Sequence, residues 1–274
     1  MTIKSRNKII LTIAIISTLS LLFFLITLTV AKITNQITPP AFYIRTFFSN
    51  FKLPLFDYHF LAAFLSISAF AVYVPVISLT CYKNFENTPS LEILFFQAFL
   101  IGILCEEVRF FMTLFSFHKS YSFILLVIGK VVIAGRILVP LSLFFSFAFN
   151  SVEDRQNAER NFIILLFVSM ATGLLFPLET QSTTSTCTVL WSFRKIFSIL
   201  RFTIFLSTLV ILLLNRFYKK LNEYGLIAVS YSIMCSGYFL LCLSDNYLAF
   251  IVSTIAFYFG SFLYLKSIHK ADLI

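Results

Sequence analysis

Three charged side chains interrupt one of the most apolar stretches of the chain, ILCEEVRFF at residues 103–111. Glu106 and Arg109 are three residues apart, so a helix places them on one face, where they can form an ion pair. Glu107 points about 100° away from Glu106 and needs a different partner. A charge placed in hydrocarbon costs at least about 2.5–3.5 kcal/mol, so this stretch is the strongest candidate for a site with a chemical role.

Three further cations, Lys130, Arg136 and Arg201, lie within other apolar runs. Lys130 lies roughly 12 Å from the end of its run, which nearly matches the depth of the two glutamates on the preceding run. We therefore predict a buried ion pair between Glu107 and Lys130. Arg136 lies about two turns deeper on the same run as Lys130.

The buried charges do not balance, because two carboxylates face four cations. The surplus of positive charge predicts a small anionic ligand. We predict a ligand- or ion-binding site formed by Glu106, Glu107, Arg109, Lys130, Arg136 and Arg201. A structural role is the alternative, since buried ion pairs can fix the register of helices and Arg201 can extend its charge to the membrane surface.

The elements that must carry these residues are membrane-spanning helices. Of the 274 residues, 59% are hydrophobic and 12% are charged, whereas a soluble domain carries roughly 25% charged residues. The excess apolar surface must face lipid, so we predict an integral membrane protein that contacts the lipid bilayer. The fold class is an all-α, polytopic transmembrane helical bundle that forms one domain over residues 1–274. Its eight candidate spans lie at about 9–31, 59–81, 91–115, 122–149, 162–178, 196–215, 224–243 and 247–265.

The loop charges predict the orientation, because Lys and Arg favour the cytoplasmic side. With the N-terminus inside, eleven lysines and arginines fall in inner segments and six in outer segments. We therefore expect both termini in the cytoplasm, and the bacterial inner membrane as the location. The Ser/Thr-rich segment 179–193 then becomes a flexible, exposed outer loop, with Trp191 as an interfacial anchor. The segment 38–56 is expected to lie either in the outer interface or as an ordinary loop over the bundle.

Several kinds of chemistry have no pattern in this sequence. Membrane orientation accounts for the net charge of +9, and no basic patch has interleaved aromatic residues, so we do not expect nucleic-acid binding. The chain has no Gly-rich phosphate loop, no GxSxG and no HExxH, and none of its five cysteines forms a CxxC pair. We expect no catalytic residues, no metal, no cofactor and no enzyme activity.

The consecutive residues Glu106 and Glu107 resemble the EExxxR signature of the CAAX-type intramembrane proteases. This chain reads EExR instead, so Arg109 comes two positions early and projects from a different face. Those enzymes also need histidines in later spans, whereas His59, His118 and His269 lie at span ends or in loops. Protease activity is therefore a remote alternative.

The helical organisation over most of the chain resembles the seven- or eight-helix membrane modules of bacterial sensor proteins of the 7TM receptor type. The resemblance implies a ligand-sensing or scaffold module. Only about nine residues follow the last span, so such a module would act through a separate signalling partner. A small-solute or ion transporter that uses the same buried charges is the alternative function.

Overall fold

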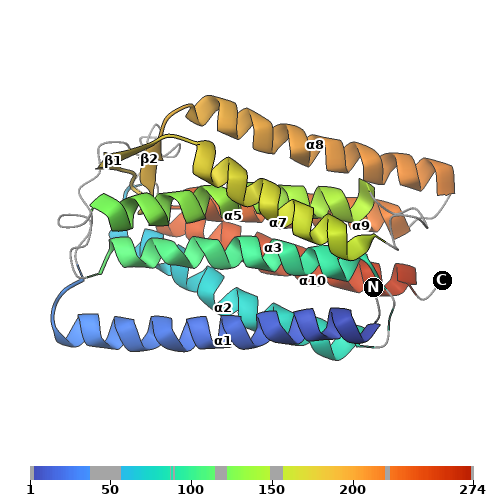
Figure 1. The fold of residues 1–274 in the computed structure, drawn as a ribbon, viewed down its shortest axis with the longest axis horizontal. Coiled ribbons are helices and arrows are strands. Elements are labelled where there is room, and N and C mark those ends of the chain that lie inside the picture. Colours follow the sequence, from blue (N-terminus) through green and yellow to red (C-terminus); the bar gives the residue numbers. More distant parts are fainter. Residues whose placement is uncertain are drawn as a thin grey trace.

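The computed structural model describes residues 3–37, 57–86, 88, 90–114, 122–148, 157–219 and 223–272, in which long helices run side by side (Figure 1). The fold class predicted from the sequence, a helical bundle, is confirmed, with one small β-hairpin added. The elements in chain order are α1 (Ile3–Ile33), α2 (Phe60–Phe85), α3 (Glu92–Glu107), η3 (Val108–Met112), α5 (Ser122–Ala148), α7 (Ala158–Leu175), β1 (Leu178–Thr183), β2 (Val189–Trp191), α8 (Arg194–Lys219), α9 (Glu223–Leu243) and α10 (Tyr247–Asp272).

The helices have the length and composition of a multi-pass membrane protein. Seven of them in the described part of the chain are long and apolar enough to cross a membrane. The predicted third span, 91–115, differs from the rest: its α-helix α3 has only 16 residues, and the short 3₁₀-helix η3 continues it. Whether this pair forms an eighth span stays a prediction.

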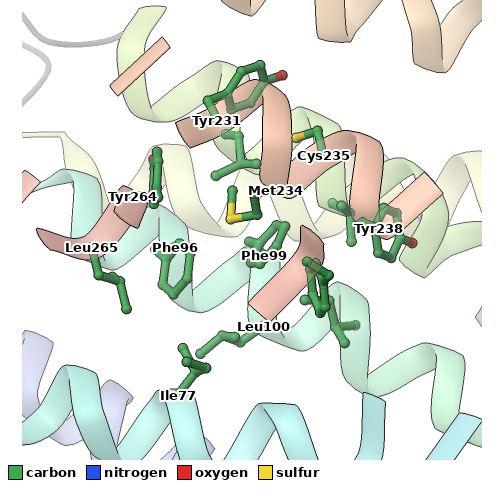
Figure 2. Close-up of a cluster of buried hydrophobic side chains, with 14 of the residues drawn as sticks. Ile77, Phe96, Phe99, Leu100, Tyr231, Met234, Cys235, Tyr238, Tyr264 and Leu265 are labelled. Carbon is green, nitrogen blue, oxygen red and sulfur yellow. The ribbon is translucent and has the colours of Figure 1, made fainter. Parts of the chain in front are cut away.

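The central helix of the bundle is α3, which packs against α2 and α5 and also touches α1 and α7. The consecutive residues Ile93, Leu94, Phe95 and Phe96 point to all sides of the helix, yet each is buried. A helix that is apolar on all sides belongs in the interior. Figure 2 shows how the side chains of α3, including Phe96 and Phe99, meet those of α9 and α10.

The outermost helices expose apolar side chains instead. α8 lies along one edge of the bundle and packs mainly on α5 and α9 (Figure 1). Its side chains Ile196 and Ile199 are 60% and 64% exposed, and Phe217 near its other end is also exposed. An apolar surface of this kind fits contact with lipid.

Two glycines allow the backbones of α3 and α5 to touch. A Cβ on Gly135 would lie 2.5 Å from the Cβ of Cys105 and 2.7 Å from the carbonyl oxygen of Gly102. A Cβ on Gly102 would in turn lie 2.8 Å from a methyl group of Val139. This close approach fixes which face of α3 meets α5, and it lies next to the charged residues of both helices.

The segment predicted as a flexible outer loop is folded and largely buried, so that prediction is wrong. β1 and β2 pair antiparallel, with Leu178 opposite Trp191 and Thr183 opposite Val189. Ser185 and Cys187 at the turn are 1% and 0% exposed, because the turn points into the bundle. Non-helical backbone is tolerated at membrane depth where protein covers it and its polar groups are paired.

The hydroxyl groups of the turn satisfy each other. The side-chain oxygens of Thr184 and Thr188 lie 2.6 Å apart, and the backbone N–H of Thr184 donates to the carbonyl oxygen of Thr188 at 2.9 Å. Ser185 donates to the carboxylate of Asp245, between α9 and α10, at 2.8 Å. These internal hydrogen bonds explain why a segment with the composition of an exposed loop can be buried.

The first turn of α1 and the last turn of α10 lie at the same end of the bundle, opposite the hairpin (Figure 1). The charge distribution of the sequence predicts this arrangement, with both termini on one side of the membrane. Which side faces the cytoplasm stays a prediction. The segment 38–56 lies outside the described residues.

The contact of α3 with α5 can be tested by adding one methyl group. We expect Gly135→Ala to lower the free energy of unfolding in detergent by about 1–3 kcal/mol, because its Cβ overlaps backbone atoms of α3. The control is Gly225→Ala on α9, where a Cβ would meet only the exposed, flexible end of Arg216 at 3.1 Å. Both variants add one methyl group to a helix, so equal stabilities would contradict the close approach of α3 and α5.

Candidate functional site

Glu106 is the centre of a buried ion network. Its Oε1 accepts a hydrogen bond from Nε of Arg136 at 2.7 Å, and its Oε2 accepts one from Nη2 of Arg136 at 3.2 Å. Nε of Arg109 lies 3.0 Å from Oε2. Glu106 and Arg109 are 0% exposed and Arg136 is 3% exposed. One carboxylate therefore neutralises guanidinium groups from two directions, with the two-point geometry that makes Arg–carboxylate pairs strong.

Arg109 connects this network to the hairpin. Its Nη1 donates to the carbonyl oxygen of Thr186 at 3.2 Å, and its Nε also points at the carbonyl oxygen of Glu106 at 3.3 Å. The predicted pairing of Glu106 with Arg109 is confirmed. The stronger pairing, of Glu106 with Arg136, was not predicted, because matched depth alone did not show which face of α3 meets α5.

The predicted ion pair between Glu107 and Lys130 is wrong. Lys130 donates to the carbonyl oxygens of Leu174, at 2.6 Å, and of Phe176. These carbonyls end α7, where the helix leaves them without partners, and a cation is favourable there. Glu107 turns instead toward α1 and accepts a hydrogen bond from Ser20 at 2.7 Å.

Glu107 and Lys130 are therefore separate from the ion network. Glu107 lines a mainly apolar cavity of about 250 Å³ between α1, α3 and α5. Of the six residues predicted to form one site, the structure brings together Glu106, Arg109, Arg136 and Arg201.

Arg201 is the cation of this group that forms no ion pair within the described residues, although its charge interacts with that of Glu106. Its guanidinium lies over the ring of Phe239 at 4.6 Å and over that of Phe197 at 5.7 Å. Its Nε and Nη2 are buried and form no hydrogen bond within the described ranges. Cation–π contacts hold the guanidinium against these rings, and Arg201 keeps donors that a ligand could use.

A cavity of about 590 Å³ lies beside Arg201 and Arg136, between the hairpin, α5, α8 and α9. Four cations line it, and none of the described residues that line it is acidic. Its lining residues are Arg136, Thr184, Thr186, Thr188, Trp191, Arg194, Lys195, Phe197, Ser198, Arg201, Phe202, Phe239 and Leu243. We call this space the cationic cavity.

Trp191, predicted as an interfacial anchor, forms part of the wall of the cationic cavity. The guanidinium of Arg136 lies 5.2 Å from the centre of its ring, and Phe197 packs edge-on against it at 5.8 Å. Trp191 is the only tryptophan in the chain. Its fluorescence therefore reports on this cavity alone.

Sequence reasoning missed the contribution of α8 and of the hairpin to the site. Arg194, Ser198 and Arg201 are spaced i, i+4 and i+7, which places them on one helix face, and this spacing could have shown the cationic surface. The threonines at 184, 186 and 188 alternate, but their composition is also typical of a solvent-exposed loop.

The electrostatics of the cavity favour an anion. The N-terminus of α8 lies at Arg194 and adds the positive end of a helix dipole. Arg194 has a buried, unpaired Nη2, although its charge also interacts with Glu179. Guanidinium donors and threonine hydroxyls match the acceptor oxygens of a carboxylate or phosphate.

The lining of the cavity in the described chain holds no His, Asp, Glu or Cys. Cys187, between the lining residues Thr186 and Thr188, is fully buried, and burial raises its pKa to about 12 although Arg109 opposes this. A thiol with this pKa stays protonated at neutral pH and is a poor nucleophile.

Comparison of the sequence and fold with protein families, curated proteins and solved structures finds no match.

A double-mutant cycle tests the ion network. We expect Glu106→Gln and Arg136→Met each to lower the free energy of unfolding in detergent by about 3–5 kcal/mol, since each leaves a buried charge without its partner. The loss in the double variant should be clearly smaller than the two losses together. Strictly additive losses would show that the two side chains are not coupled.

Glu107→Gln is the matched control for Glu106→Gln. The Gln amide oxygen can still accept the hydrogen bond from Ser20, so we expect a loss of about 1 kcal/mol or less. Combined with Lys130→Met, its effect should be additive, because the two side chains have different partners. A loss as large as that of Glu106→Gln would contradict the assignment of Glu106 as the residue that balances the arginines.

Proposed function

We propose that this protein is a multi-pass membrane protein whose cationic cavity binds a small organic anion, as the ligand-sensing module of a signalling system. One observation carries the proposal: four cations and no carboxylate of the described chain line the cavity, and one of these cations, Arg201, has buried donors without a hydrogen-bond partner. Unpaired buried donors cost free energy, and an anionic ligand would recover that cost.

The size and lining of the cavity favour an organic anion over a simple inorganic one. A volume of about 590 Å³ lies within the roughly 300–1,000 Å³ of sites for drug-sized ligands. Trp191, Phe197, Phe202 and Phe239 supply aromatic surface next to the cations. A ligand with both an anionic group and an apolar body matches this lining.

The hairpin supports a role in sensing. Thr186 lines the cavity, while its carbonyl oxygen accepts from Arg109 of the ion network. Ser185 beside it is bonded to Asp245, between α9 and α10. A ligand that contacts Thr186 would therefore lie next to two further contacts of the hairpin, one with Arg109 and one with Asp245. In this proposal, a shift of the hairpin on binding is passed to a separate signalling partner, as expected for a 7TM-type sensor module in a bacterial inner membrane.

A transporter is the second candidate function. Arg136 lies near the middle of α5, which spans Ser122–Ala148. Arg194 and Leu243, at the ends of α8 and α9, also line the cavity, so it extends from the hairpin end of the bundle toward the half-way depth at which transported solutes usually bind. The two candidates share the anion site and differ in whether the ligand crosses the membrane.

The native fluorescence of Trp191 provides the test of anion binding. We expect phenyl phosphate and benzoate to change its emission saturably in purified, detergent-solubilised protein, because both place an anion and a ring in the cationic cavity. Benzyl alcohol, which has the ring without the charge, should have no comparable effect. Arg201→Gln should weaken phenyl phosphate binding about tenfold or more, as expected for the loss of a charge-assisted hydrogen bond.

Arg216→Gln is the matched control, since Arg216 is exposed on the same helix and does not line the cavity. If neither anion changes the emission of Trp191, or if both variants weaken binding equally, the proposed anion site is wrong. Uptake of radiolabelled benzoate into proteoliposomes separates the two functions: saturable uptake that Arg201→Gln abolishes would favour transport over sensing.

A further inference from the structure

The cationic cavity reaches the lipid-facing surface of the bundle beside α8. Phe202 lines the cavity and is 57% exposed, and Leu243 of α9 lines it and is 39% exposed. Ile199, close to them on α8, is 64% exposed. The cavity is therefore continuous with an apolar surface that contacts lipid when the helices span a membrane.

The gap between α8 and α9 is closed farther along α8. Phe205 stacks on Tyr231 of α9 at 5.4 Å and also packs edge-on against Phe239 at 6.1 Å. These rings seal the contact of the two helices less than one turn beyond Phe202. The exposed residues of the cavity lining are Phe202 and Leu243 together with Lys195 and Ser198, so the opening extends from the apolar pair toward the first turns of α8.

The lining of the cavity combines cations and hydroxyls with apolar side chains. The hairpin and α5 contribute the hydroxyls of Thr184 and Thr188 and the charge of Arg136. α8 contributes Arg194, Lys195 and Arg201 as well as Phe202, and α9 contributes Phe239 and Leu243. A ligand that entered beside Phe202 and Leu243 would therefore meet both apolar side chains and cations.

We propose that the ligand of the cationic cavity is an anionic amphiphile, with a phosphate or carboxylate headgroup and an alkyl chain, and that it arrives from the bilayer through the opening between α8 and α9. This inference rests on the proposed anion site and names its ligand class. The headgroup occupies the surroundings of Arg136, Arg194 and Arg201. The chain passes Phe202 and Leu243 and continues along the apolar surface of α8.

The length of the chain provides the first test. Ethyl, butyl and octyl phosphate are titrated against Trp191 fluorescence in protein solubilised in a neutral maltoside. Each methylene that becomes buried should tighten binding by up to roughly fourfold. Because longer chains also partition into micelles, the decisive quantity is the ratio of the Kd of a variant to that of the wild type at each chain length.

Phe202→Ala should weaken octyl phosphate binding several-fold and leave ethyl phosphate binding nearly unchanged, since only the longer chain reaches Phe202. Arg201→Gln should weaken the binding of all three esters by the same factor. The matched control is Phe217→Ala on the same helix, whose side chain is 74% exposed and does not line the cavity. It should not change any of the three affinities.

Competition in nanodiscs tests the source of the ligand. Phosphatidic acid in the bilayer should reduce the response to octyl phosphate, and phosphatidylcholine alone should not. If phosphatidic acid has no effect, the route from the bilayer is wrong. If Phe202→Ala weakens all three esters equally, the amphiphile proposal is wrong, while binding of ethyl phosphate or phenyl phosphate would leave the anion site standing. If no anion binds, the proposed function fails as well.

Discussion

The arrangement of the bundle depends on one buried carboxylate, that of Glu106. It is fully buried, it pairs with Arg136 of α5 and with Arg109 of η3, and the hydroxyl of Tyr238 on α9 lies 3.4 Å from it. Without it, two guanidinium groups would lie in an apolar interior with no counter-charge, which is among the most destabilising changes that a side chain can cause. Because one negative charge serves two positive charges, the network is stable and still net positive.

The other cations near the bundle interior are accounted for by a different contact. Lys130 donates to carbonyl oxygens at the end of α7, and Arg6 donates to those of Phe85 and Glu86 at the end of α2. A helix C-terminus carries partial negative charge and unpaired carbonyl oxygens. Both cations form hydrogen bonds with these oxygens, which the hydrocarbon of a bilayer cannot do. Arg201 forms no ion pair with a described carboxylate and is held by aromatic rings. The positive surplus that the sequence predicts is thereby located at one place, the cationic cavity.

The sequence predicts the helices well, because apolar runs of this length have one stable form in a membrane. It also predicts the pairing of Glu106 with Arg109, which depends only on their spacing along one helix. The pairing of Glu106 with Arg136 depends on how α3 is rotated against α5, and the contact of Gly102 with Gly135 sets that rotation. Depth along a helix carries no information on rotation, which is why depth matching led to the wrong partner for Glu107.

The hairpin shows a second limit of sequence reasoning. Serine and threonine are typical of exposed loops because their hydroxyls need partners, and water is the most common one. Here Thr184 and Thr188 are each other's partners and Ser185 has Asp245, so the same residues are stable inside the bundle. Whether such a segment is exposed or buried depends on its contacts with distant parts of the chain, and these contacts cannot be predicted from composition.

The buried hairpin also decides how the cavity is related to the ion network. The side chain of Thr186 faces the cavity, and its carbonyl oxygen accepts from Arg109, so one residue contributes to both. An anion in the cavity would compete with Glu106 for the guanidinium of Arg136, because that side chain belongs to both as well. Any shift of Arg136 toward the ligand leaves Glu106 more dependent on Arg109 and therefore on the position of the hairpin. In the proposed function, these two residues would couple ligand binding to the packing of the central helices, and the site would thereby report the presence of its ligand to the rest of the bundle.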